Sequence, residues 1–426
     1  MDISNHRAAG GLDPDFATDG IFTFALDTYG PLTINGLVQD SDGNIITALM
    51  LADRENVANF YGIGRLLKDG TVDPDFGVNG VVAGQFSGNQ PSFGGIPAIN
   101  RDGKLLLSGY FITNGQPGAR VPAIAQHLST GEIDPDFGEA GKVIFDFPPP
   151  KSGAGQNDVA MGGPPDTLYE YFSFDITPLP DGKIVFSGVV EADRDNQSSR
   201  FSVLGRLNTD GSLDESFGNQ GYIYPKGLRN IVDQHLVQSD GKILISGQME
   251  SVSGHMGYVA RYLSEGTLDR GFGAAGYLFI PELDGGHVTA LALYGHDSVL
   301  VGVNKPKPSG SRWRGRLLAF AGNGEPDPDF NGGQPVDISL GTTGFWLVLK
   351  DLTVDGDGVV LLGDAGFVAL ARYRLDGTPD LSYGNSGWWQ YPGKESYDLA
   401  RQPDGKILAT GMGDTAEKFV ARFLGH

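Results

Sequence analysis

The chain has 426 residues with 65 Gly, 25 Pro and no Cys, so it holds neither a disulfide framework nor a thiolate site. Its apolar content of 40% is too high for a disordered chain, and so many turn residues among apolar runs favour short strands joined by tight turns. The formal charge of −21 opposes binding to phosphate backbones and anionic lipid, so we expect no nucleic-acid partner.

The N-terminal stretch 1–16 lacks the apolar region of a secretory signal, and no run of about 18 apolar residues follows it. We therefore expect no cleaved leader and no membrane insertion. This leaves the compartment open between the cytoplasm and export by a route without a signal. We also expect a monomer.

An acidic and aromatic phrase recurs along the whole chain, as in VDPDFG from Val72 and LDESFG from Leu213. The leading aspartates lie 53 to 61 residues apart, except for one interval of 80, at Asp13, Asp73, Asp134, Asp214, Asp269, Asp327 and Asp380. Such a period is typical of repeat architectures and is the first feature that a fold prediction must explain.

Two further phrases fall between neighbouring copies. One is an Asp-Gly turn followed by an apolar run, as in PDGKIVFSG from Pro180, and it is degenerate near His296. The other carries an Arg, as in LGRL from Leu204. Asp-Gly between apolar runs indicates a hairpin because Gly accepts the positive φ of the turn. Each unit therefore reads as four short strands, which is the pattern of a propeller blade.

The ends of the chain predict how the ring closes. The last unit stops after its third strand near Leu424, and the missing fourth strand follows Leu12 at the N-terminus. Joining them removes the open edges that an unclosed sheet would expose. We predict one all-β, seven-bladed β-propeller spanning 1–426, with blades at 27–86, 90–146, 170–226, 229–281, 286–340, 345–392, and 395–426 plus 11–25.

The phrases resemble the bacterial delta-sixty repeat, whose units read Leu-Asp-x-Ser-Phe-Gly, then Asp-Gly-Lys-Ile-Leu-Val-x-Gly, then Ala-Arg-Tyr. Residues 213–218 and 240–247 match it best, and the resemblance covers essentially the whole chain. The chain departs from it with Asp in place of Ser at Asp15, Asp75, Asp136 and Asp329. The resemblance implies the propeller fold and brings no catalytic motif with it.

Residues repeated in nearly every blade are expected to be structural. The Phe of the first phrase should wedge between sheets, and the leading Asp should cap turn amides or pair with the Arg of strand three. In two blades Gln126 and Ala319 replace that Arg. The alternative is calcium binding by the Asp-Pro-Asp pairs or by Asp355 and Asp357, although no downstream Glu completes a calcium loop.

The links that vary between blades mark one face as the binding surface, opposite the short Asp-Gly turns. Three stretches stand out there. The insertion 147–169 is either a lid over the channel or a surface loop. The blade-two loop begins at Tyr110. The stretch 303–316 is basic and carries an indole. It is either a site where the indole stacks on a sugar or an aromatic group and an Arg holds an anion, or a solvated basic loop. Its candidate binding residues are Lys305, Lys307, Arg312, Trp313 and Arg314.

Strand one of each blade should line the central channel. Six residues before each turn Asp stand Asp175, Asp351 and Asp398, with Gln234 in a fourth blade and Gly36, Ile96 and Leu291 in the others. The three carboxylates either converge on a cation or act as acid and base, or their side chains point between blades.

Three functions remain. The first is a non-enzymatic propeller that recognises a protein or a glycan through the variable face. The alternative is a lyase or hydrolase that uses the channel carboxylates, with Ca²⁺ as the one cofactor considered. The third is a structural module of a bacterial surface. The fold does not choose among them.

Overall fold

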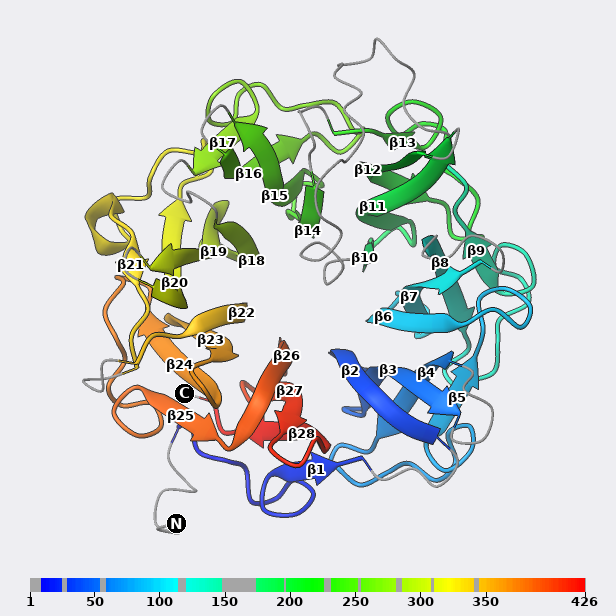
Figure 1. The fold of residues 1–426 in the computed structure, drawn as a ribbon, viewed down its shortest axis with the longest axis horizontal. Coiled ribbons are helices and arrows are strands. Elements are labelled where there is room, and N and C mark those ends of the chain that lie inside the picture. Colours follow the sequence, from blue (N-terminus) through cyan, green and yellow to red (C-terminus); the bar gives the residue numbers. More distant parts are fainter. Residues whose placement is uncertain are drawn as a thin grey trace.

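The computed structural model describes residues 9–24, 29–53, 59–113, 120–147, 174–194, 197–225, 231–251, 254–280, 286–307, 310–340 and 345–425. These residues form seven four-stranded antiparallel sheets arranged around a central opening (Figure 1). The only helical element in these ranges is a 3-10 turn, Asn331–Gly333. The predicted all-β, seven-bladed propeller is therefore confirmed. The same ranges hold no helix with the length and apolar character of a membrane span.

Each blade runs outward from the channel in chain order, except at the closure. Blades one to three contain β2 (Tyr29–Gln39), β3 (Ile45–Asp53), β4 (Asn59–Leu66), β5 (Val81–Gly84); β6 (Ser92–Ile99), β7 (Leu105–Ile112), β8 (Arg120–His127), β9 (Lys142–Ile144); and β10 (Phe174–Pro178), β11 (Ile184–Arg194), β12 (Gln197–Leu207), β13 (Tyr222–Ile223). Blades four to six contain β14 (Ile231–Val237), β15 (Ile243–Ser251), β16 (Gly254–Tyr262), β17 (Tyr277–Ile280); β18 (His287–Tyr294), β19 (Ser298–Lys307), β20 (Gly310–Phe320), β21 (Val336–Asp337); and β22 (Val348–Asp355), β23 (Gly358–Asp364), β24 (Val368–Arg374), β25 (Trp388–Tyr391).

The seventh blade joins the two ends of the chain. Its sheet has the order β26 (Gly393–Arg401), β27 (Ile407–Gly413), β28 (Lys418–Phe423) and then β1 (Ile21–Thr23). Strand β1 pairs antiparallel with β28, with Ile21 opposite Ala421. In Figure 1 the blue β1 lies beside the red β28. The N-terminal strand thus completes the last blade as predicted, and this blade has no unpaired outer edge on β28.

A repeated clamp joins blades one, three, four and seven to the next blade and explains the Asp and Phe of the first phrase. At the closure, Arg422 Nε lies 2.8 Å from Asp13 Oδ2, and the guanidinium stacks 4.5 Å from the ring centroid of Phe16. The same Arg donates to the carbonyl of Lys68 in blade one. The expected pairing of this Asp with the strand-three Arg is therefore confirmed. The same Arg also binds the neighbouring blade.

Where the Arg is missing, other donors satisfy the Asp. In blade two, Gln126 Nε2 and Lys104 Nζ each lie 2.7 Å from Asp134 Oδ2. In blade five, the hydroxyl of Tyr294 donates to Asp327 Oδ2 at 2.5 Å. A buried carboxylate without donors is strongly unfavourable, so each substitution of the Arg comes with its own replacement.

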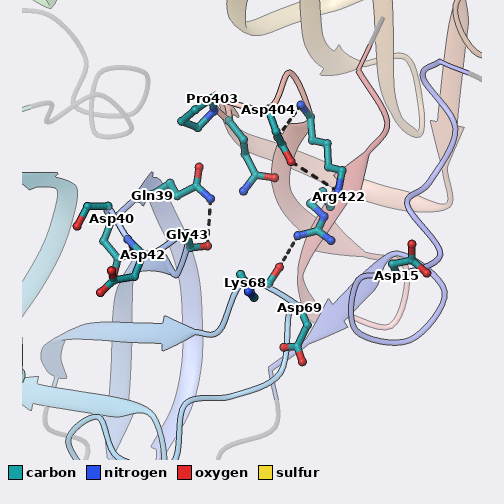
Figure 2. A pocket seen from close by; sticks show the side chains of 13 residues that line it. Asp15, Gln39, Asp40, Asp42, Gly43, Lys68, Asp69, Pro403, Asp404 and Arg422 are labelled. Carbon is teal, nitrogen blue, oxygen red and sulfur yellow. Dashed lines mark hydrogen bonds and ion pairs between the residues drawn. The ribbon is translucent and has the colours of Figure 1, made fainter.

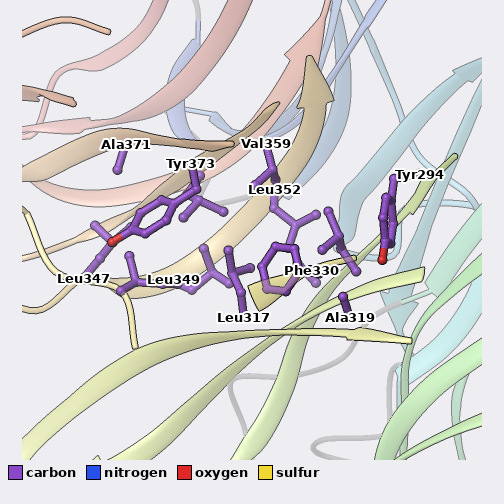
Figure 3. Packing of buried hydrophobic residues seen from close by; sticks show 14 of the residues in the cluster. Tyr294, Leu317, Ala319, Phe330, Leu347, Leu349, Leu352, Val359, Ala371 and Tyr373 are labelled. Carbon is purple, nitrogen blue, oxygen red and sulfur yellow. The ribbon is translucent and has the colours of Figure 1, made fainter. Parts of the chain in front are cut away.

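The apolar core lies between the sheets rather than within any one of them. The Phe wedges of the first phrase are almost completely buried, and Phe16 packs against blade one. Between blades five and six, Leu317 and Phe330 from one sheet pack against Leu349 and Leu352 from the other (Figure 3). Burial of each such side chain contributes about 1.5–3 kcal/mol, so neighbouring blades stabilise one another.

Candidate functional site

The three channel carboxylates lie on the innermost strands, as their register predicts, and each accepts a backbone N–H from the next blade. Asp398 Oδ2 lies 2.7 Å from Leu37 N, and Asp351 Oδ2 lies 3.0 Å from Leu399 N. Asp175 Oδ2 lies 3.3 Å from His235 N. These strands face the channel, so their outward N–H groups have no neighbouring strand to pair with. The carboxylates supply the missing acceptors.

The other residues at this position follow the same requirement. Gln234 Oε1 accepts the N–H of Leu291 at 2.8 Å. Between blades one and two the acceptor position is Gly36, and a Cβ there would collide with the ring of Pro97. Proline has no N–H, so no acceptor is needed at that boundary. In five of the seven blades, the residue at this point of the innermost strand therefore contacts the next blade.

Asp351 and Asp398, on neighbouring inner strands, lie close enough for the ionisation of one to affect the pKa of the other. Burial, together with the charge of Asp398, raises the pKa of Asp351 well above its ordinary value. Burial raises the pKa of Asp398 to about 6, and the charge of Asp175 acts in the same direction. The pair therefore holds a proton near neutral pH. Catalytic acid and base pairs commonly consist of two carboxyl groups whose pKa values differ.

A Ser, a His and an Asp also meet beside the channel, at blades three and four. Ser187 Oγ lies 2.8 Å from His235 Nδ1, and Asp175 Oδ2 lies 3.3 Å from the same nitrogen. A hydrolytic triad needs the Ser and the Asp on opposite ring nitrogens. Ser187 is also buried, and burial lowers the pKa of His235. This cluster has the residues of a triad without its geometry.

The proposed metal ligands Asp355 and Asp357 lie around an arginine. Arg372 Nη2 lies 2.7 Å from Asp357 Oδ1, and Arg401 Nε lies 3.0 Å from Asp355 Oδ1. Among the residues that the structure describes, no three His, Asp or Glu side chains are grouped as metal ligands. The guanidinium groups occupy one oxygen of each carboxylate, which opposes the binding of a cation there.

The insertion 147–169 lies outside the described residues, apart from the buried Phe147. The basic stretch forms the hairpin of β19 and β20, and the side chains of Lys307 and Arg312 are likewise outside the described part. Within this hairpin, Arg314 Nη1 lies 3.5 Å from Asp337 Oδ2, and its guanidinium lies 5.4 Å from the ring centroid of Trp346. Burial raises the pKa of Asp337, but the Arg316 hydrogen bond and the charges of Arg316, Arg314 and Lys305 together hold it below its ordinary value.

Trp313 is 39% exposed and belongs to a larger aromatic surface. We call the side chains of His287, Trp313, Phe345, Trp346 and Phe367 the blade 5–6 surface. His287 meets Trp313 edge to face at 5.4 Å, and Phe345 meets Phe367 at 5.7 Å. Gly315 N donates to Leu347 O at 2.5 Å and brings the two segments together.

The remaining members of this surface were not predicted from sequence. Phe345 is 43% exposed, and it lies with Trp346 in the link between blades five and six. Lys350 follows on β22, with a side chain that is 41% exposed. Its charge adds to burial in lowering the pKa of His287, so this cation lies close to the aromatic rings. An apolar link without charges gives no sequence signal of binding.

Tyr110 lies on β7, at the start of the blade-two loop, and stacks on Phe93 at 4.9 Å. The guanidinium of Arg120 lies 5.2 Å from its ring centroid. Both faces of the Tyr110 ring therefore have neighbours in the chain itself. The ring has less free surface for a ligand than the indole of Trp313.

Comparisons with known proteins agree with this architecture. A family model described as a domain of unknown function (DUF5122) beta-propeller matches residues 179–217 and 238–272, which supports a β-propeller repeat protein. The search of curated proteins found no match.

Among solved structures, the chain is similar to the polysaccharide lyase Uly1, with 11% identity, a TM-score of 0.50, and coverage of 100% of this chain and 95% of that chain. It is also similar to a protein of unknown function from Dyadobacter fermentans, with 14% identity, a TM-score of 0.44, and coverage of 84% and 96%. At such identities the likeness shows the fold alone.

Proposed function

We propose that this chain is a delta-sixty-type propeller that binds a glycan or a protein through its variable face and catalyses no reaction. The blade 5–6 surface is the proposed contact. The observation that carries the proposal is the exposure of Trp313 and Phe345 on adjoining segments of one face. Large exposed aromatic side chains that gather in one place are typical of interaction sites.

The chemistry of this surface suits a sugar ring or an aromatic side chain. The indole of Trp313 offers a flat apolar face, and His287 holds it from the side. Lys350 supplies a cation whose charge acts on His287, and its Nζ lies 3.9 Å from Asp364 Oδ2. Arg314 is already engaged by Asp337 and Trp346, so it orients the surface rather than offering a free charge.

The test compares variants on a glycan array and on a peptide array. Trp313→Ala and Phe345→Ala should each abolish the binding that the unmodified chain shows. Phe279→Ala is the matched control, because Phe279 is 40% exposed on the outer strand β17 of blade four. Equal binding by all variants, or blank arrays for the unmodified chain, would contradict the proposal.

A second candidate function rests on a different observation, the carboxyl pair of Asp351 and Asp398. In this alternative, the chain is a lyase or hydrolase, with Ca²⁺ assisting at the channel mouth. The pair offers one protonated and one ionised carboxyl group, which acid and base chemistry requires. Degradation of a polysaccharide panel that Asp398→Asn abolishes, while Trp313→Ala leaves it intact, would favour this function over binding.

A further inference from the structure

Cations flank the blade 5–6 surface. Three belong to the hairpin of β19 and β20 and one to β22, namely Lys305, Arg314, Arg316 and Lys350. Arg314 contacts the surface directly, because its guanidinium lies 5.4 Å from the ring centroid of Trp346. The side chain of Lys350 is exposed, and its charge acts on His287 of the same surface. Positive charge therefore reaches the aromatic rings from both blades.

The cations of the hairpin outnumber the carboxylate that they share. Arg316 Nε lies 2.5 Å from Asp337 Oδ1, and Arg314 Nη1 lies 3.5 Å from Asp337 Oδ2. Lys305 stands opposite Arg314 in the strand pair, and its charge acts on the same carboxylate. Like charges at opposed positions of an antiparallel pair are unfavourable. One carboxylate thus faces three cations, and an anion from outside the chain would relieve their mutual repulsion.

This concentration of positive charge contrasts with the chain as a whole, whose formal net charge is −21. The pocket at the closure, between the turns of blades seven and one, has acidic surroundings instead (Figure 2). Five aspartates and three cations line that pocket. An anionic ligand is repelled by such surfaces and attracted to the hairpin, so the charge favours one place on the molecule as well as one kind of ligand.

The large apolar side chains exposed on the blade 5–6 surface are both aromatic. They are Trp313 and Phe345, whereas exposed aliphatic side chains such as Val78 and Ile144 lie on blades one and two. A sugar ring presents a side of C–H groups that packs on the flat face of an aromatic ring. Its ionised substituents lie at the edge of the ring, where neighbouring cations reach them. Aromatic rings flanked by cations therefore suit a sugar that carries negative charge.

We propose that the ligand of the blade 5–6 surface is an acidic glycan. Its sugar rings pack on Trp313 and Phe345, its ionised groups pair with Lys350, and the hairpin cations attract them through their charge. This inference rests on the proposed function and narrows it to one class of ligand. The carboxylate of a uronic acid and the sulfate ester of a sulfated sugar share the required chemistry, because Lys and Arg bind both by charge-assisted hydrogen bonds.

The experiment is a calorimetric titration of the full chain with three oligosaccharides of similar length. They are an oligogalacturonate, its fully methyl-esterified form, which has the same rings without the charge, and a chondroitin sulfate oligosaccharide. We expect at least one of the acidic ligands to bind at least about tenfold more tightly than the neutral ester. The tighter of the two acidic ligands shows whether carboxylate or sulfate is the preferred anion.

Lys350→Met should weaken binding of the acidic ligand by about fivefold and leave binding of the neutral ester unchanged. The matched control is Lys394→Met. Lys394 is exposed near the start of β26 in blade seven, as Lys350 is near the start of β22 in blade six. The control variant should bind the acidic ligand as the unmodified chain does.

If the neutral ester binds at least as tightly as both acidic ligands, the inference is wrong, while the proposed function stands as long as Trp313→Ala abolishes that binding. Equal losses in Lys350→Met and Lys394→Met would also overturn the inference, since they would show attraction without a site. Binding of the acidic ligand that survives in Trp313→Ala would do the same. Absence of heat with all three ligands overturns it as well, and the glycan and peptide arrays then decide whether the proposed function fails with it.

Discussion

Replacement of Asp351 by Asn should make the protein more stable at neutral and basic pH. In the native chain, burial raises the pKa values of both Asp351 and Asp398, and the charge of Asp398 raises the pKa of Asp351 further. An Asn at this position keeps one oxygen to accept the N–H of Leu399, but it loses the oxygen that accepts the N–H of Leu352 at 2.7 Å. The repulsion is removed at the cost of one backbone hydrogen bond, which reduces the gain.

The sign and size of the effect follow from linkage. Since the native pKa of Asp398 is raised from 3.8 to about 6, the folded chain holds a proton that the unfolded chain releases between these values. Stability is therefore highest below the unfolded pKa and falls as the pH rises through about 6. This pKa difference corresponds to at most about 3 kcal/mol, and partial solvation of the pair reduces it, so we expect about 1–2 kcal/mol.

The assay is urea unfolding at about pH 4.5 and about pH 8. Asp351→Asn should gain stability at the higher pH and little at the lower. Asp351→Leu is the control, since it removes the repulsion but also the acceptor for Leu399, and it should be less stable than Asp351→Asn at both. If Asp351→Asn is less stable than the unmodified chain at about pH 8, the pair is not under repulsion and the reasoning fails.

Three further predictions follow from the clamp, the turns and the Asp355 loop. Arg422→Met should destabilise the chain by about 2–4 kcal/mol, whereas Arg374→Met should cost much less, because the Arg374 side chain is 52% exposed and lies 3.7 Å from Asp380 Oδ1. Equal urea midpoints would contradict the role of the clamp. Gly70→Ala should lower the free energy of unfolding by about 1–3 kcal/mol more than Gly103→Ala. Both glycines have positive φ, but only at Gly70 would the added Cβ lie within 2.6 Å of an aromatic carbon, so thermal unfolding should give the lower Tm for Gly70→Ala. Addition of about 1 mM Ca²⁺ or of a chelator should leave Tm unchanged, since Arg372 and Arg401 hold the Asp355 and Asp357 carboxylates, and a rise in Tm that chelation reverses would restore the calcium site.

The repeat made the fold predictable from sequence, while the surroundings of single side chains were not. The spacing of Asp13 and its counterparts gave the number of blades, and the truncated last unit gave the closure. The same count placed Asp351 and Asp398 on channel-lining strands. It gave no indication that their oxygens accept N–H groups from the following blade, because that contact depends on how two sheets pack.

Two parts of the candidate surfaces illustrate the same limit. Trp313 stood out because it lies among basic residues, but its neighbour Phe345 lies in an apolar link that carries no such pattern. The pocket at the closure was not predicted either, because Gln39 and Gln402, which both line it, come from opposite ends of the chain. Repeated turns on that face indicated structure alone.

Hydrogen exchange of the chain with and without the tightest ligand from the arrays tests the central claim of binding at the blade 5–6 surface most directly. Binding at this surface should protect β18, β20 and the start of β22, where the aromatic side chains lie. Protection confined to the inner strands β10, β22 and β26 that carry the channel carboxylates, with none in β20, would contradict it.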